Sequence, residues 1–133
     1  MAITIDADVI IGGEKGGFDF HTWLLSLPEE TFEIAAITVA ELWHGVERAG
    51  GARRAVRAAY LQSAIRSLPV VSYTEEIAYE HARIWARMQE AGKMIGDYDL
   101  IVAATALSRG NSVATFNTRH FNLVPGLGII KPE

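Results

Sequence analysis

Two aspartates, Asp97 and Asp99, stand two positions apart in the stretch IGDYDLIVA, directly before the apolar run Leu100–Leu107. A helix that enters a protein core begins with backbone N–H groups that lack partners, and its dipole favours an anion at that end. One carboxylate would meet that need. The second aspartate therefore directs attention to other acidic residues that the fold brings to the same place.

Acidic and amide side chains also follow three β-strand candidates. Asp6 and Asp8 follow the short run ITI, Glu41 comes shortly after FEIAAIT, and Asn117 follows SVATF. Structural roles compete here, because Asp6 or Asp8 can cap the next helix and Thr38 with Glu41 forms the S/T-x-x-E pattern of a capping box. For Glu41 taken alone, the capping role is favoured.

The conjunction of these acids favours a metal site. The carboxyl ends of parallel strands meet at one edge, so we expect Asp6 and Glu41 there, together with the helix that Asp97 and Asp99 open. Carboxylates in a partly buried crevice raise each other's pKa, and a divalent cation removes the repulsion. Oxygen ligands select hard ions, so the sequence predicts Mg²⁺ or Mn²⁺ with a substrate phosphate as a further ligand.

Other motifs give weaker signals. Glu41 and His44 form a single E-x-x-H, whereas the di-iron carboxylate bundle needs that motif twice on four helices. The remaining histidines, including His120, show no ligand spacing. The glycine-rich stretch IIGGEKGG (Ile10–Gly17) lacks both the P-loop and the dinucleotide-binding patterns, so we interpret it as a loop rather than a phosphate cradle.

Strands and helices alternate along the chain. The pattern predicts strands over residues 3–5, 32–38, 69–73 and 112–116, a short last strand in GLGII, and helices over 39–48, 52–67, 74–91 and 97–108. The clearest helix has Thr74 as its cap, Gly92 as its stop, and an apolar stripe made of Ile77, Ile84, Trp85 and Met88. This alternation predicts a three-layer α/β/α domain with a central parallel sheet.

Composition limits the class of protein. A chain of 133 residues with 50% hydrophobic content is expected to form a single domain over 1–133. It contains no cysteine, which excludes disulfides and thiolate metal sites, and it shows no secretory or membrane-spanning segment, so a soluble cytoplasmic protein is expected. The net charge of −4 argues against holding nucleic acid by bulk electrostatics.

Five arginines nevertheless fall within nineteen residues: Arg48, Arg53, Arg54, Arg57 and Arg66. A small nucleic-acid footprint and a solvated helix face explain this local basic patch about equally well.

Four segments in order resemble the PIN domain, and specifically the VapC toxins of bacterial toxin–antitoxin pairs: IDADVII, ITVAELWHGV, GDYDLIVAATAL and SVATFNTRHFNLVPGL. The resemblance covers nearly the whole chain. It implies a PIN-like fold, a metal-dependent endoribonuclease that cleaves single-stranded regions of structured RNA such as tRNA or rRNA, a cognate VapB-type antitoxin that neutralises it, and a homodimer.

Carried over by position, the resemblance assigns Asp6, Glu41 and Asp99 as metal ligands and catalytic residues, with Asn117 as a further catalytic residue. Two positions depart from the family pattern. Asp8 stands where Asn or Ser is common, and Asn117 stands where many members have an acid. Asp97 is then left as the helix cap. The antitoxin is expected to insert a basic side chain among the three metal ligands.

Among the arginines, Arg53, Arg54 and Arg57 are candidates for contacts with RNA phosphates. Two other functions remain open at this stage. Because DAD after a first strand imitates a D-x-D motif, a haloacid-dehalogenase-like phosphatase is possible, with Asp6 as its nucleophile. A catalytically inactive PIN module that only binds a partner is the other.

Overall fold

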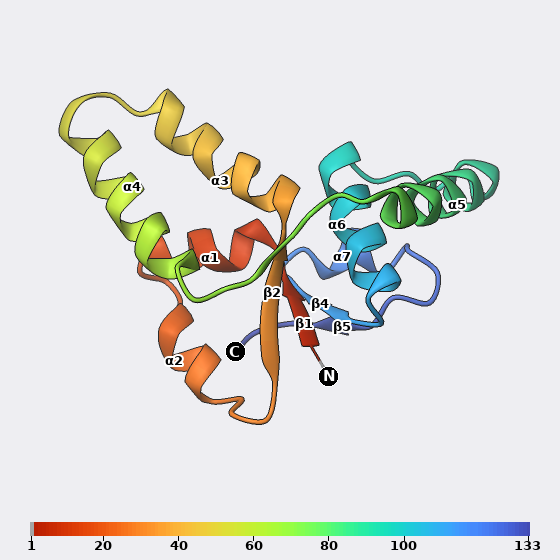
Figure 1. Cartoon of the computed structure of the whole chain (residues 1–133), viewed down its shortest axis with the longest axis horizontal. Coiled ribbons are helices and arrows are strands. Elements are labelled where there is room, and N and C mark those ends of the chain that lie inside the picture. Colours follow the sequence, from red (N-terminus) through yellow and green to blue (C-terminus); the bar gives the residue numbers. More distant parts are fainter. Residues whose placement is uncertain (1) are drawn as a thin grey trace.

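The computed structural model describes residues 2–133, and its centre is a five-stranded sheet in the order β3-β2-β1-β4-β5 (Figure 1). All neighbouring strands are parallel. The strands are β1 Ala2–Ile5, β2 Thr31–Ala35, β3 Val70–Val71, β4 Ser112–Ala114 and β5 Ile129–Ile130. The helices are α1 Ala7–Glu14, α2 Phe20–Leu25, α3 Ala36–Arg48, α4 Gly51–Ile65, α5 Glu75–Ala91, α6 Asp97–Ser108 and α7 Thr118–Phe121.

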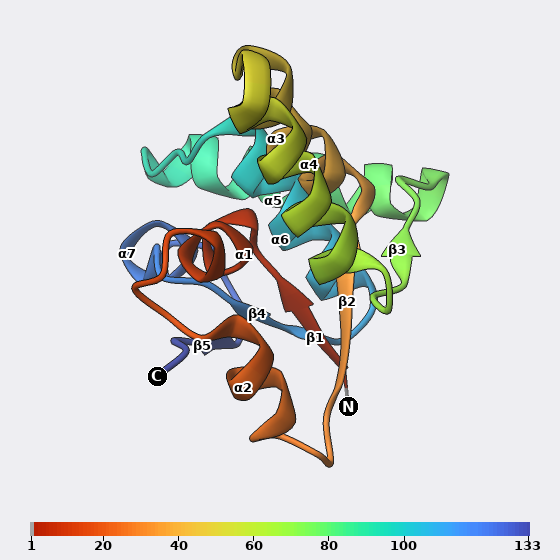
Figure 2. The ribbon, with the colours of Figure 1, turned by 90° about the vertical axis from the view of Figure 1, so that its left-hand side faces the viewer.

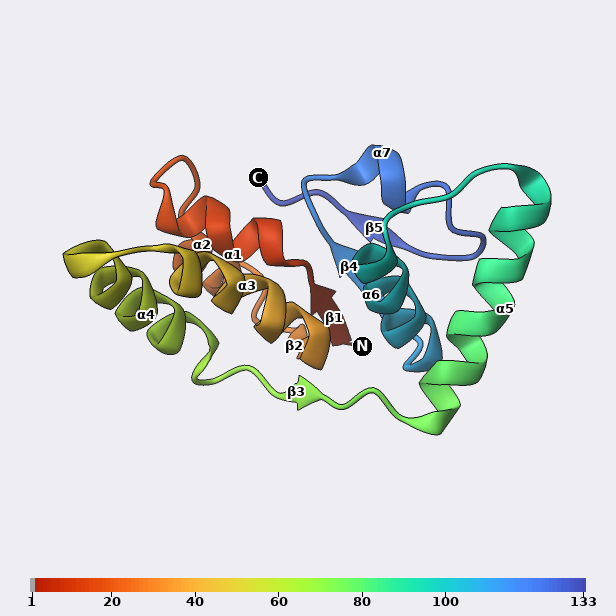
Figure 3. The same cartoon turned by 90° about the horizontal axis from the view of Figure 1, so that it is seen from above.

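The helices cover the sheet on both faces, which confirms the predicted three-layer architecture. Helices α1 to α4 lie on one side, and α5 to α7 lie on the other (Figures 1 and 3). Figure 2 shows α1, α2 and α4 on the face turned toward the viewer. Two apolar clusters fill the layers, one around Ile5, Ile10 and Leu42 and the other around Met88 and Leu100. No helix within residues 2–133 is long and apolar enough to cross a membrane.

Helix α5 forms where its end signals predict it. The Thr74 hydroxyl accepts a hydrogen bond from the Ile77 backbone N–H at 3.2 Å, and Gly92 ends the helix in the left-handed region at φ 69°. Ile77, Ile84 and Met88 are buried as expected. Trp85 is not, because 48% of it is exposed, so its assignment to the apolar stripe is wrong.

The second strand is shorter than predicted. It ends at Ala35, and α3 begins at Ala36, so Ile37 and Thr38 are helical although their β-branched side chains favour a strand. Burial on the core side of the helix outweighs that preference, since Thr38 is fully buried. The capping-box interpretation of Thr38 and Glu41 is therefore wrong, because the N-cap position is Ala35.

The prediction of a loop over the glycine-rich stretch is wrong for residues 10–14, which are helical, and right for residues 15–17. Helix α1 continues through Gly12 and Gly13 to Glu14. A β-carbon at Gly12 would lie 3.1 Å from the Phe116 ring, and one at Gly13 would collide with Phe20 Cβ and the Tyr60 hydroxyl. These glycines allow close packing of α1 against its neighbours, and that packing offsets their low helix propensity.

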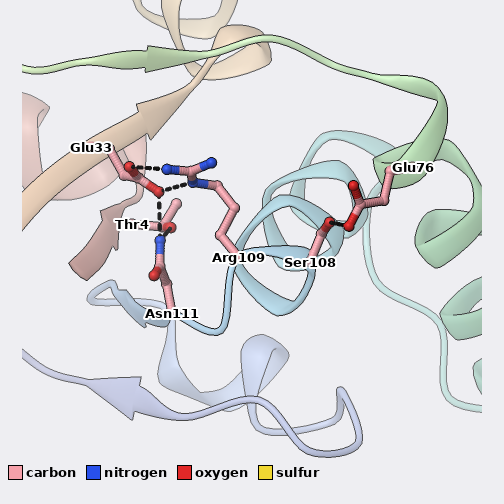
Figure 4. Close-up of polar contacts among 6 residues, drawn as sticks. All are labelled: Thr4, Glu33, Glu76, Ser108, Arg109 and Asn111. Atoms are coloured by element: carbon pink, nitrogen blue, oxygen red, sulfur yellow. Dashed lines mark hydrogen bonds and ion pairs between the residues drawn. The ribbon is translucent and has the colours of Figure 1, made fainter. Parts of the chain in front are cut away.

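A polar network ties the strands together near the end of α6 (Figure 4). Glu33 on β2 is buried and accepts hydrogen bonds from the Arg109 guanidinium and from Asn111 Nδ2, the latter at 2.6 Å. Asn111 also donates to Thr4 Oγ1 on β1 at 3.2 Å. The network joins β1 and β2 to the turn between α6 and β4, and so fixes where β4 enters the sheet.

The connection that follows β1 and the connection that precedes β4 run over opposite faces of the sheet. The chain leaves β1 into α1 on one face, whereas β4 is reached from α6 on the other face. In an open parallel sheet, such a point forms a crevice at the carboxyl ends of the strands. The fold therefore positions this crevice next to Asp6, which directly follows β1.

Candidate active site

Asp6 is the most buried carboxylate at this edge, with 5% of the residue exposed. It occupies the N-cap of α1, where its Oδ1 accepts from the Ala7 backbone N–H at 2.9 Å and its Oδ2 from Thr115 Oγ1 at 2.8 Å. Burial, and after it the charge of Asp8, raises the pKa of Asp6 to about 7, with smaller contributions from Asp99 and Glu41. The side chain is thus rigidly held in an electronegative setting.

Asp8 lies in the first turn of α1 and is anchored to the end of β4. Its carboxylate accepts from the Phe116 backbone N–H at 3.1 and 3.2 Å. Burial raises its pKa, although the hydrogen bonds from Phe116 and Thr115 oppose the shift. Asp8 therefore links two elements of the site and adds negative charge beside Asp6.

Glu41 projects from the second turn of α3, and its Oε1 is buried without a hydrogen-bond partner among residues 2–133. Burial raises its pKa to about 7, with further contributions from the charges of Asp99 and Asp8. Thr38 Oγ1, one turn earlier on the same helix, is likewise buried and unpaired among these residues. A buried polar atom without a partner is costly, which indicates that Glu41 faces a site for a ligand.

The two aspartates of IGDYD take different positions. Gly96 is the N-cap of α6, and Asp97 is the first helical residue, so the prediction that Asp97 caps the helix is wrong. Asp97 is exposed. Asp99 is half-buried, and burial raises its pKa while His120 partly opposes the shift. Since Asp99 contributes to the raised pKa of both Asp6 and Glu41, the structure brings these three carboxylates into one electrostatic cluster.

Asn117 lies at the edge of this cluster, after β4. Its Nδ2 is 3.0 Å from Nδ1 of His120, and its backbone N–H donates to Thr115 Oγ1 at 2.9 Å. Sequence reasoning missed two residues here. Thr115 donates to Asp6 and accepts from the Asn117 backbone N–H, and burial raises the pKa of Asp99 while the electrostatic effect of His120 lowers it. His120 follows the strand candidate 112–116, whereas Thr115 lies inside it, so only His120 had a positional signal.

The donor set fits a hard divalent cation. Among residues 2–133, no three acidic or histidine side chains already converge as a ready-made metal-binding group. Mg²⁺ does not require one, because it commonly keeps several waters and binds through one or two carboxylates plus substrate phosphate. The unpaired Oε1 of Glu41 and the raised pKa values of Asp6 and Glu41 are what a cation would relieve.

The arginines expected to contact phosphate differ in whether they already form ion pairs within the protein. Arg54 pairs with Glu47 at 2.8 Å, and Arg57 pairs with Glu14 at 2.9 Å. Arg53 has no ion-pair partner among residues 2–133. The predicted patch is therefore partly neutralised within the protein.

Comparison with known proteins assigns the chain to a family. The sequence profile described as PIN domain matches residues 3–127. The chain is 28% identical to Ribonuclease VapC1 of Rickettsia felis over 98% of its own length and 96% of that protein. It is 34% identical to the tRNA(fMet)-specific endonuclease VapC of Salmonella typhimurium over 72% of this chain and 71% of that one. The structure of DNA-bound VapBC from Salmonella typhimurium superposes with a TM-score of 0.86 and 27% identity, covering 98% of this chain and 97% of that one.

Proposed function

The chain belongs to the PIN-domain family and, within it, to the VapC ribonuclease toxins, and from this premise we propose that it is a Mg²⁺- or Mn²⁺-dependent endoribonuclease. The observation that carries the proposal is the cluster of Asp6, Glu41 and Asp99, with a buried and unpaired carboxylate oxygen on Glu41. A bound divalent cation supplies two things, a lowered pKa for a water nucleophile and neutralisation of charge on the phosphoryl oxygens.

The chain's own residues have separate tasks in this proposal. Asp6, Glu41 and Asp99 hold the cation. Thr115 donates to Asp6 and so fixes the rotamer of that carboxylate. Asn117, steadied by its contact with His120, is positioned to orient a water or a phosphate oxygen at the edge of the cluster.

We propose single-stranded regions of structured RNA as the substrate. The relative from Salmonella typhimurium carries a name that specifies tRNA(fMet), which supports tRNA as the first RNA to test. The phosphatase alternative gains no support, since the family profile and the relatives are PIN-domain ribonucleases. The RNA cleavage assay described next distinguishes a catalytically inactive PIN module from the proposed enzyme.

The test is cleavage by the purified chain. Total RNA is incubated with the protein after chelation of metal and again after addition of Mn²⁺, and new RNA ends are mapped by sequencing. We expect discrete ends only with Mn²⁺ and their loss in Asp99→Asn. Equal cleavage after chelation would overturn the metal dependence, and no cleavage under either condition would favour the inactive module.

A VapB-type antitoxin is the proposed inhibitor. The structural relative from Salmonella typhimurium is VapBC, and the structure of VapBC-5 from Mycobacterium tuberculosis is described as a member of the VapBC family of toxin–antitoxin systems. The acidic cluster of this chain suits a basic side chain from such a partner. Inhibition should then weaken as Mn²⁺ rises, because both ligands need the same carboxylates. Homodimerisation remains a prediction from the family resemblance.

A further inference from the structure

Basic cavities lie at the turn between α3 and α4. One, of about 250 Å³, is lined by Gly45, Arg48, Arg53 and Arg57 together with the turn itself. A second, of about 410 Å³, shares Arg53 and Arg57 and extends to Lys15. The two cavities therefore meet along one side of α4, and both are lined by cationic side chains, with Glu14 as the one acidic residue in the second.

The charge in these cavities is only partly balanced. Arg57 forms two hydrogen bonds with Glu14, from Nε at 2.9 Å and from an Nη at 3.0 Å. Arg48 and Arg53 have no ion-pair partner among residues 2–133. On a chain whose net charge is −4, this is a concentrated excess of positive charge, and the N-terminal dipole of α4 adds to it.

The cavities begin close to the acidic cluster. A β-carbon at Gly45 would lie 2.8 to 2.9 Å from three atoms of the Arg57 guanidinium, so Arg57 rests directly on α3 at this residue. Gly45 follows Glu41 by one helical turn, a rise of about 6 Å. Arg57 is therefore held in place by its hydrogen bonds with Glu14 and by packing against Gly45. Gly45 lies one helical turn beyond Glu41, a proposed metal ligand.

We propose that Arg48 and Arg53 bind backbone phosphates of the RNA strand next to the bond that is cleaved. Arg57, which Glu14 holds in place, lines the same subsite. The inference rests on the proposed ribonuclease function and extends it to a subsite outside the acidic cluster. Guanidinium groups suit phosphate oxygens through paired N–H donors. Contacts of this kind position the strand without reading its bases, so the subsite contributes affinity rather than sequence choice.

Binding is measured in the full-length chain carrying Asp99→Asn, with a fluorescein-labelled single-stranded RNA of mixed sequence over a range of salt concentrations. The double variant Arg48→Gln/Arg53→Gln should bind about tenfold more weakly. Its slope of log K against log salt should fall by about 1.4, since each phosphate contact to a single strand contributes about 0.7. The control Arg66→Gln/Arg87→Gln removes the same charge from exposed arginines outside the cavities and should leave the slope unchanged.

Two further variants separate charge from shape. Arg48→Lys/Arg53→Lys keeps the charges and should recover most of the lost affinity. Gly45→Ala keeps every charge but displaces the Arg57 guanidinium, and it should weaken binding with no fall in thermal midpoint. In the background with Asp99 intact, Arg48→Gln/Arg53→Gln should raise KM for RNA cleavage with little change in kcat, because it removes binding away from the reacting atoms.

The outcomes are distinct. If Arg48→Gln/Arg53→Gln binds RNA with the same affinity and salt slope as the Arg66→Gln/Arg87→Gln control, the inference is wrong, while RNA cleavage by the parent chain leaves the proposed function intact. If the double variant instead weakens only the complex with the antitoxin, the cavities belong to a protein interface and the inference is also wrong. If the parent chain neither binds nor cleaves RNA, it is the proposed function that fails.

Discussion

Asp6, Glu41 and Asp99 belong to three separate elements, yet, besides burial, the charge of Asp99 raises the pKa of both other carboxyls. Their positions in the sequence, after strands and at the start of an apolar helix, predict that they lie near one another, and their role as metal ligands stays a prediction. Thr115 was missed because it was assigned to a strand, where its hydroxyl had no visible purpose. Its role depends on an Asp6 oxygen more than a hundred residues away in sequence, which no local pattern reports.

The raised pKa of Asp6 makes a signed prediction for the metal-free protein. A carboxyl whose pKa is about 7 in the folded chain, against 3.8 ordinarily, binds more protons when folded than when unfolded. Its stabilising contribution is therefore complete below about pH 3.8 and is lost as pH rises through 7. Asp6→Asn should remove this dependence and raise the free energy of unfolding at pH 8 by roughly 2–4 kcal/mol.

Urea unfolding with a chelator present, at pH 5 and at pH 8, measures this effect. Asp97→Asn is the control, because Asp97 is exposed and outside the cluster. An Asp6→Asn variant that loses stability equally at both pH values would mean that its hydrogen bonds to Ala7 and Thr115 outweigh the cost of its buried charge.

The same first turn of α6 allows a matched test of function. Asp99→Asn should abolish RNA cleavage with no loss of stability, since it removes one of the clustered charges. Asp97→Asn should retain cleavage and cost only about 0.3–1 kcal/mol of stability through its weaker interaction with the helix dipole. Single-turnover cleavage and thermal melting of both variants decide this. Equal loss of activity in the two would give Asp97 a role at the metal.

At the scale of elements, the capping residues of α5 predict its ends correctly, whereas the composition of other segments does not predict their extent or burial. Thr74 and Gly92 mark the two ends of α5 as predicted, because capping is a local interaction. The end of β2, the extent of α1 and the exposure of Trp85 were mispredicted, because each is decided by packing between elements. Gly12 and Gly13 illustrate this. Their residue type favours a loop, whereas in the structure the absence of a side chain lets other residues pack closely against a helix.

The network around Glu33 predicts where elements are most tightly coupled. Glu33→Gln removes charge-assisted hydrogen bonds to Arg109 and Asn111 in a buried setting, and it should lower the free energy of unfolding by about 1.5–3 kcal/mol. Glu47→Gln is the matched control. Its ion pair with Arg54 is well exposed, at 50% for Arg54 and 61% for Glu47, and it should cost no more than about 1 kcal/mol.

Urea unfolding gives both values, and an unchanged dependence on urea concentration would show that the denatured state is the same in the two variants. The assignment of Glu33 as a structural tie is wrong if the two substitutions have equal effects. It is also wrong if Glu33→Gln lowers RNA cleavage while leaving stability unchanged.

At the scale of the whole molecule, the clustered carboxylates and the basic cavities lie at different places along α3. Asp6, Glu41 and Asp99 come from the N-cap of α1, from α3 and from the start of α6. Arg48 and Arg53, which form no ion pair among residues 2–133, line the cavities at the turn between α3 and α4. Figure 3 shows where these helices and that turn lie.

Alternation of strands and helices was enough to predict the layers and the sheet edge at which Asp6 lies. No pattern in the sequence tells which arginines form ion pairs, because Glu14 and Arg57 meet only once α1 and α4 are packed.

Metal binding should be visible in the stability of the whole chain. An ion that binds only the folded protein stabilises it by mass action, by about 2.7 kcal/mol at a hundred times its dissociation constant. Mn²⁺ should therefore raise the thermal midpoint at pH 8. Protons compete for the same oxygens, and since the pKa of Asp6 and of Glu41 is about 7, the gain should shrink as pH falls below 7.

Scanning calorimetry with and without Mn²⁺, at pH 8 and at pH 5, measures the gain directly. Because metal-free stability falls with rising pH while the Mn²⁺ contribution grows, the two midpoint curves should diverge toward alkaline pH. Asp97→Asn should keep the divergence, and Asp99→Asn should abolish it. A gain that is equal at both pH values, or that survives in Asp99→Asn, would mean that Mn²⁺ binds elsewhere on the folded chain and that the clustered carboxylates are not its ligands.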